Sequence, residues 1–213
     1  VYPRQGIDMN LSLQITPPYS AFRGDDVDYK SMSDEDRYRW IEYHKWSGKI
    51  AVFTKLVGDL VLMTRAQFGY LGYYNRDLGY SPFEGFLVGG DGMSGYSTYG
   101  SEVISLRGYD NYSLTPVVDG AYAGNVYDKF TLELRYPVIL QPSSTIYALV
   151  FLEGGNCWAD IRDFNPFEIK RSAGIGLRVM LPVVGLLGVD WGYGFDSTDD
   201  NKSQFHFVIG QQF

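Results

Sequence analysis

Polar and apolar residues alternate along several segments of the chain, which is the pattern of β-strands with two different faces. In the segment FTLELRYPV, residues 130–138, every second residue is apolar, and the residues between them include Thr131, Glu133 and Arg135. In a later segment, three glycines and Asp190 alternate with large apolar residues. The pattern predicts eight strands, near residues 7–17, 38–57, 59–74, 127–140, 144–156, 170–181, 186–197 and 203–213.

The connections between these predicted strands are alternately long and short. About 20 residues join the first two strands and about 50 join the third and fourth, whereas tight turns are expected at residues 57–59, 141–143 and 182–185. Outer-membrane barrels have long extracellular loops and short periplasmic turns. A soluble β-sandwich also has alternating strands, but a strand of about 20 residues, as predicted for 38–57, is rare in one. The pattern therefore favours an all-β, antiparallel transmembrane β-barrel whose C-terminus is periplasmic.

The composition agrees with a barrel. The chain holds 18 Tyr, 13 Phe, 4 Trp and 25 Gly, and 16% of its residues are aromatic. Such a content suits aromatic girdles at two membrane interfaces. No apolar run of about 18 residues occurs, so a membrane-spanning helix is not expected, whereas alternating membrane strands average out on hydropathy scales.

The charges and the reactive side chains exclude several function classes. The net charge of −7 and the absence of a basic stripe argue against a nucleic-acid partner. Cys157 is the single cysteine, so no internal disulfide can form, and we expect it at a strand end. His44 and His206 lie far apart in sequence without companions. No nucleophile and base, metal-ligand spacing or cofactor motif is recognisable, so we expect no enzyme, no metal and no cofactor.

Two acidic stretches contain the carboxylate ligands that calcium prefers. Residues 25–28 and 34–36 carry several carboxylates, but they lack the ligand spacing of a known calcium loop, and a solvated loop is expected. The sequence Ser33-Asp34-Glu35-Asp36 also has the form of a helix N-cap followed by an acidic first turn, which predicts a short helix in this loop.

The final segment, QFHFVIGQQF, has the form of a closing outer-membrane strand. Phe205, Phe207 and Ile209 share one face, and the chain ends on the aromatic Phe213. The alternative, an ordinary hydrophobic edge strand in a soluble protein, would be an aggregation risk. Gly210 interrupts the register of side chains near the end, and we expect it to kink this strand.

Several motifs, in order, resemble the C-terminal half of the BamA-type outer-membrane insertase family, within the bacterial surface antigen superfamily. Gly89-Gly90 followed by Leu106-Arg107-Gly108-Tyr109 is similar to the family's glycine pair and VRGF-type motif in its sixth extracellular loop, with Leu for Val, Tyr for Phe and an insertion between the two. The other matching stretches are YPRQG at 2–6, LELRYP at 132–137, FLEGG at 151–155, with Glu153 where Asp is usual, RSAGIG at 171–176 and the closing strand.

The resemblance implies where the loop arginine lies. It implies that residues 1–213 are about eight strands of a sixteen-strand barrel, and that the long loop at about 75–126 folds back into the lumen. Arg107 would then meet Glu133 and Glu153, because its planar fork of donors can bind carboxylates at two points. Gly108 would allow a close backbone approach, and Tyr109 would pack against the wall. The expected effect is on loop placement and assembly rather than on a chemical reaction.

The resemblance also implies a function and partners. The family inserts and folds β-barrel clients in the bacterial outer membrane, and its last strand, here 203–213, forms a weak seam that templates an incoming strand. The implied partners are membrane lipid, unfolded outer-membrane proteins, the N-terminal part of the barrel with periplasmic modules, and accessory lipoproteins. Three alternatives remain: a polypeptide-secretion pore, a translocation-and-assembly barrel of the same superfamily, and a small stand-alone eight-strand barrel, which would pair residues 7–17 with 203–213.

Overall fold

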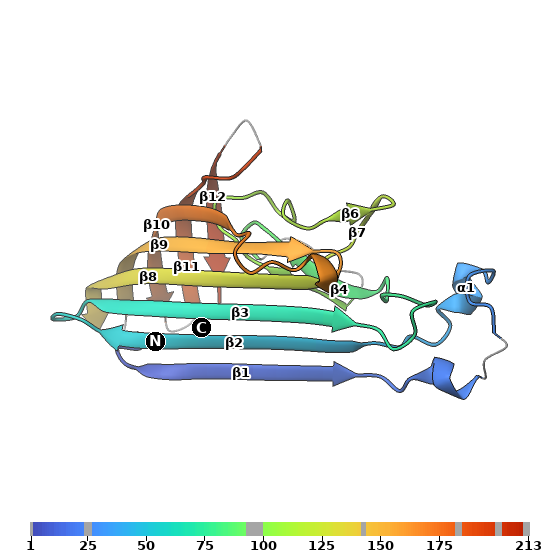
Figure 1. Cartoon of the computed structure of the whole chain (residues 1–213). Helices are drawn as coiled ribbons and strands as arrows, with labels where there is room; N and C mark the ends of the chain where they lie inside the picture. Colours follow the sequence, from blue (N-terminus) through green and yellow to red (C-terminus); the bar gives the residue numbers. More distant parts are fainter. Residues whose placement is uncertain are drawn as a thin grey trace.

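The computed structural model of the chain is built around one curved, antiparallel sheet of eight strands (Figure 1). It describes residues 2–23, 27–92, 100–141, 144–181, 185–198 and 202–210. The strands follow the chain order β1-β2-β3-β8-β9-β10-β11-β12 across the sheet. Their bounds are β1 Gly6–Ile15, β2 His44–Lys55, β3 Val61–Gly72, β8 Val126–Gln141, β9 Ser144–Trp158, β10 Lys170–Leu181, β11 Gly185–Gly194 and β12 Ser203–Ile209.

The predicted alternation along the strands is confirmed, and it separates two unlike faces of the sheet. One face, called here the outer face, exposes apolar side chains, and the other buries polar and charged ones. Exposed on the outer face are Ile7, Met9, Leu11, Leu132, Leu134, Val150, Leu152, Ile175, Leu177, Trp191, Phe205, Phe207 and Ile209. Buried on the inner face are Lys45, Lys129, Thr131, Glu133, Arg135, Glu153, Ser172, Arg178, Asp190 and His206. This inverted arrangement is that of a membrane barrel wall, with apolar residues toward lipid and polar residues inside.

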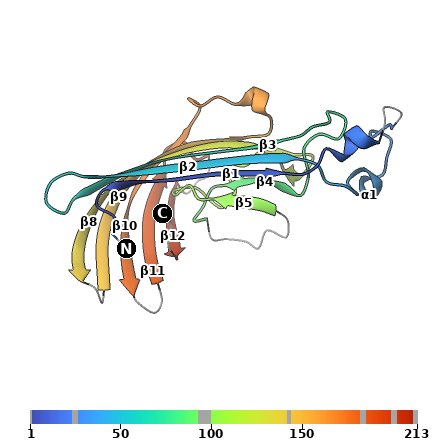
Figure 2. The ribbon, with the colours of Figure 1, turned by 90° about the horizontal axis from the view of Figure 1, so that it is seen from below.

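The long connection between β3 and β8 lies against the concave inner side of the sheet (Figure 2). The sequence suggested no strands in this segment, and that expectation was wrong. It contains the parallel pair β4 Glu84–Val88 and β5 Gly100–Ile104 and the hairpin of β6 Val117–Val118 with β7 Ala121–Tyr122. These strands contain five residues at most, too few to show an alternation. Phe86 and Val88 of β4 join Leu71 and Tyr127 of the wall in a buried cluster, which fixes the loop to the sheet.

The second strand begins later than predicted. Residues 38–57 were expected as one strand, but β2 starts at His44. The apolar residues before it pack elsewhere: Tyr38 caps the helix α1 Asp34–Arg37 and meets Phe83, and Trp40 meets Tyr19. Their apolar character thus reflects packing within the loop between β1 and β2, which also contains the 3-10 turn η1 Tyr19–Phe22.

Two local predictions are confirmed. Ser33 caps α1, since its side chain accepts a hydrogen bond from the backbone N–H of Asp36. The connection of β2 to β3 is a tight turn in which Gly58 has a φ of +60°, a conformation that favours glycine. The predicted turns at 141–143 and 182–185 fall largely on residues 142–143 and 182–184, outside the described residues.

The eight strands form an open sheet. In the part of the chain that the structure describes, no pairing joins β1 to β12, so each of these strands has one edge without a neighbouring strand. The pairing of 7–17 with 203–213 required for a stand-alone eight-strand barrel is therefore not present in this arrangement.

Candidate functional site

Three strands bring three carboxylates to one place on the inner face. Glu133 lies on β8, Glu153 on β9 and Asp190 on β11, and all three are at most 5% exposed. The antiparallel register aligns Glu153 with Thr131 of β8 and with Ser172 of β10, so these side chains point the same way. A buried group of negative charges needs cationic partners, because an unpaired buried charge is costly.

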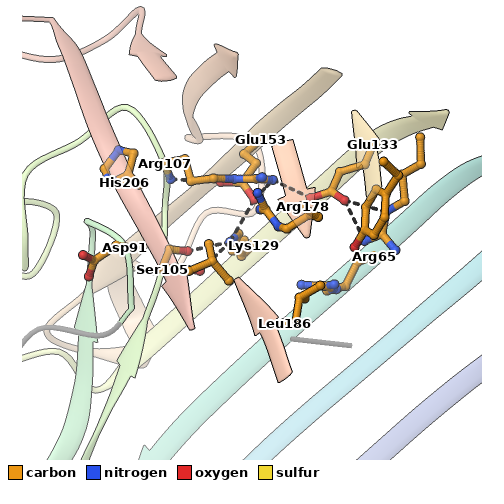
Figure 3. Close-up of a pocket in the computed structure, with 13 residues that line it drawn as sticks. Arg65, Asp91, Ser105, Arg107, Lys129, Glu133, Glu153, Arg178, Leu186 and His206 are labelled. Carbon is orange, nitrogen blue, oxygen red and sulfur yellow. Dashed lines mark hydrogen bonds and ion pairs between the residues drawn. The ribbon is translucent and has the colours of Figure 1, made fainter. Parts of the chain in front are cut away.

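Arg107 of the long connection lies beside Glu153 and Glu133 (Figure 3), and it also contacts Asp190. Its Nη2 donates to Glu133 Oε1 at 2.7 Å and to Glu153 Oε1 at 2.8 Å, and its Nη1 donates to Asp190 Oδ2 at 3.1 Å. The backbone N–H of Arg107 also donates to Glu153 Oε2 at 2.9 Å. The guanidinium carbon lies 3.6 Å from the ring centroid of Phe151, a distance for a cation–π contact. Arg107 is only 6% exposed, so this is a buried network rather than a surface ion pair.

Each carboxylate that binds Arg107 also has a second cation. Arg135 Nε donates to Glu133 at 2.8 Å, and Lys129 Nζ lies 3.1 Å from Glu153. Arg178 binds both oxygens of Asp190, at 2.6 Å and 2.7 Å. The wall strands therefore supply a cation to each of the three carboxylates, and the loop inserts one more cation among them.

The backbone of the loop comes unusually close to the wall beside Arg107. Gly108 has a φ of +89°, and it lies against Gly192 and Gly194 on the inner face of β11. A Cβ atom on Gly192 would lie 2.7 Å from Gly108 N, and one on Gly194 would lie 2.5 Å from Gly108 O. The N–H of Gly108 donates to His206 Nε2 on β12 at 2.8 Å. The glycines on both sides thus allow backbone-to-backbone contact.

The neighbours of Arg107 and Gly108 fix the rest of the motif. Leu106 is fully buried in the cluster with Phe86 and Val88. The Tyr109 hydroxyl donates to the carbonyl oxygen of Arg171 at 2.8 Å, and burial raises the pKa of Tyr109 to about 12. All four residues of the predicted motif therefore contact either the wall strands or β4 of the same loop.

The predicted glycine pair supports the same loop. Gly89 and Gly90 have φ values of +125° and +77°, and Gly90 forms an isolated bridge with Leu106. A Cβ on Gly89 would lie 2.5 Å from the carbonyl oxygen of Asp110. The inserted residues between the pair and the motif include β5, whose end Ile104 accepts a hydrogen bond from Gly89 N. The insertion therefore leaves the contact between the two motifs in place.

Arg107 keeps its charge in this environment. Burial alone disfavours a cation, but Glu153, Glu133 and Asp190 outweigh it and hold the pKa of Arg107 above its usual range. The charged Arg107 and its three carboxylates can therefore hold the long loop in one position against the wall.

The closing strand has an apolar outer face and a polar inner one. Phe205, Phe207 and Ile209 are 61–71% exposed on the outer face, while His206 faces Gly108. The strand ends at Ile209, and Gly210 follows with a φ of +93° and donates its N–H to the carbonyl oxygen of Leu186. Phe213 lies outside the described residues.

Sequence reasoning missed several members of this site. Arg107 or Gly108 is contacted by Asp190, Phe151 and His206. The alternation along their strands indicated that these three side chains face inward, but not that they meet the loop. The available signal was the row of glycines around Asp190, which predicts a surface that another backbone approaches. Arg65 of β3 lines a small cavity beside Arg107 (Figure 3), and its Nε has no hydrogen-bond partner among the described residues.

Among the described residues, no group of three or more His, Cys, Asp or Glu side chains is placed to hold a metal ion. In the same residues, no helix has the length and apolar character needed to cross a membrane. Cys157 is buried at the end of β9, as expected.

Comparison with known proteins places the whole chain in one group. The family model described as the Omp85 superfamily domain matches residues 1–213. No curated protein matches the chain. The family match extends over both the eight-stranded wall and the connection that carries Arg107.

Proposed function

Because the chain belongs to the Omp85 superfamily, we propose that it is the client-binding part of an outer-membrane barrel that folds and inserts other β-barrel proteins. The superfamily contains outer-membrane assembly and secretion barrels, and the all-β structure agrees with an outer-membrane location. Our proposal is the finer one, that of an insertase of the BamA type acting through a lateral seam at β12. The periplasmic modules and accessory lipoproteins that the resemblance implies belong to the same proposal.

The observation that carries the proposal is that β12, among the described residues, has a neighbouring strand on one side only, namely β11. The outer face of β12 is apolar, and its short length of seven residues compares with 10 to 16 for the other strands of the sheet. A short strand offers few ladder hydrogen bonds, so its pairing with a neighbouring strand is weak and can exchange. Free backbone N–H and C=O groups on such an edge can template an incoming strand by β-augmentation.

The Arg107 network gives the edge a fixed inner support. His206 on β12 accepts the N–H of Gly108, and Arg107 holds the same loop to β8, β9 and β11. We propose that the docked loop keeps the inner surface behind β12 in place while the seam opens. Exposed strand edges in lipid are costly, so the open sheet requires further strands, and we propose that eight of them complete a sixteen-strand barrel.

A disulfide lock at the seam tests the proposal in the full-length protein. In a Cys157→Ser background, Gln204→Cys would be paired with a cysteine on the strand that faces β12. Oxidation should abolish insertion of a client barrel into liposomes, measured by heat-modifiable gel mobility, and reductant should restore it. Client insertion that continues with the seam locked would refute the proposal.

A second cysteine pair serves as a matched control. Tyr193 and Ser203 already face each other across β11 and β12, so the pair Tyr193→Cys and Ser203→Cys leaves the outer edge of β12 free. Insertion should persist when this pair is oxidised. If the full-length protein instead exported a polypeptide and inserted no client, the secretion barrel of the same superfamily would be supported in place of the insertase.

A further inference from the structure

A depression lies on the outer face of the sheet, over β1, β2, β3 and β8. We call it the outer groove, and its volume is about 410 Å³, within the range of small-molecule sites. Small residues form its floor, since Gly48 of β2 and Ala66 of β3 occupy outward positions where other strands carry large side chains. Its apolar walls are Met9, Leu11, Ile50, Phe68, Phe130, Phe164 and Pro166.

One wall of the outer groove comes from the connection between β9 and β10. This connection, which includes the 3-10 turn η2 Ile161–Asp163, lies on the side of the sheet opposite to β4 and β5 (Figure 2). Phe164 packs against Phe68 of β3 and Trp158 of β9, with ring centroids 6.2 Å and 5.0 Å apart. The Asn156 side-chain amide donates to the carbonyl oxygen of Glu168 at 2.8 Å. The connection is thus fastened over the outer face and encloses one end of the groove.

A buried carboxylate lies at that enclosed end. Asp128 of β8 shares the outward parity of Phe130, and the register places it in one row with Phe68 and Gly48. It lines the outer groove and is only 3% exposed. Backbone N–H groups of Asn156 and of Asp128 itself lie nearby, but within the described part of the chain neither carboxylate oxygen has a hydrogen-bond partner of good geometry. An ionisable group on a lipid-facing surface without a partner marks a functional site.

We propose that the outer groove binds one phospholipid with a primary ammonium head group, such as phosphatidylethanolamine. One acyl chain would lie over Gly48 and Ala66 between the apolar walls. Both carboxylate oxygens of Asp128 are buried, so its side chain would turn toward the groove to accept hydrogen bonds from the ammonium group. The carboxylate selects this class, because it repels an anionic head group and because a choline head group has no N–H to donate. A peptide is disfavoured on the floor of the groove, since β2 and β3 are paired on both sides and offer no edge to its backbone. The open edge of β1 would be covered by the further strands that we propose for the barrel.

Photo-crosslinking in nanodiscs tests this site. The full-length protein would be placed in phosphatidylcholine bilayers with a trace of phosphatidylethanolamine that carries a diazirine on its acyl chain, and labelled peptides would be mapped by mass spectrometry. Labelling should concentrate on the peptides containing Gly48, Phe68 and Phe130. Unlabelled phosphatidylethanolamine should displace the labelled lipid from the groove about tenfold better than phosphatidylcholine does. A factor of about ten corresponds to one charge-assisted hydrogen bond.

Two variants separate the head-group contact from the acyl site. Asp128→Asn should remove the preference for the ammonium lipid but keep the labelling. Gly48→Leu should abolish the labelling, and it is compatible with the fold because a Cβ there would lie 3.7 Å from Leu11 Cδ1. Leu177→Phe, on the outer face of β10 away from the groove, is the control that should change nothing. Uniform labelling around the barrel, or equal competition by both lipids in the unchanged protein, would overturn the proposal.

Discussion

Replacing Arg107 by alanine is expected to release the loop from the inner wall while leaving the eight-stranded sheet intact. The side chain makes three charge-assisted hydrogen bonds and one ring contact. Its removal leaves Glu133, Glu153 and Asp190 with fewer partners, but each keeps one cation from the wall. The stranded charge is therefore only partial.

The structure allows an estimate of the cost. Removing one partner of a buried ion pair costs about 3–5 kcal/mol, and the retained cations place this case near the lower end, at about 3 kcal/mol. That value corresponds to a shift of about a hundredfold in the equilibrium between docked and undocked loop. Arg107→Lys should fall between alanine and arginine, because lysine keeps the charge but cannot bind several carboxylates with a planar fork.

Hydrogen exchange measures this equilibrium directly. The amides of Arg107 and Gly108 are bonded to Glu153 and His206, so they exchange when the loop undocks. Exchange of these amides in the full-length protein should accelerate about a hundredfold in Arg107→Ala. Arg162→Ala, which removes an exposed arginine with a 3.8 Å contact to Asp160, is the matched control and should leave the rates unchanged. Equal protection in Arg107→Ala and the unchanged protein would refute the reasoning.

Three further predictions concern the loop and its neighbours. Gly192→Ala should undock the loop at a cost of about 1–3 kcal/mol, because the added Cβ meets the Gly108 backbone, and the same exchange assay should detect it. Tyr109→Phe removes one hydrogen bond and should cost about 1 kcal/mol in that assay. Hydrogen bonds from Arg171 lower the pKa of Asp196 to about 2, so this contact stabilises the fold above the ordinary pKa of 3.8 and is lost as the pH falls toward 2. Protection of the Arg171 amide should decrease over that window, but not in Asp196→Asn.

Each of these has a result that would contradict it. Unchanged exchange in Gly192→Ala would mean that the loop is not held by close backbone contact. A loss in Tyr109→Phe as large as that in Arg107→Ala would mean that the ion network is not the main anchor. A pH profile that is the same in Asp196→Asn would mean that another group titrates.

The sequence by itself determined the wall of this protein. Alternation along segments such as 130–138 predicted both the strands and their two faces, because side chains in a strand point to opposite sides in turn. The same parity placed Glu133 and Glu153 on one face, and the resemblance supplied Arg107 as their partner. Where loop residues were themselves apolar, as with Tyr38 and Trp40, the alternation extended the predicted strand too far.

Only the tertiary structure decided which residues meet across strands. Asp190 and His206 are 83 and 98 residues from their contacts in the loop, and no periodicity carries that information. The short strands β4 to β7 also depend on packing against the wall, since their own sequences are too brief to specify a face. The register of β3 and β8 placed Asp128 beside an outward depression. Parity is a local property of one strand, whereas a site depends on the alignment of several strands and on the loop that covers them.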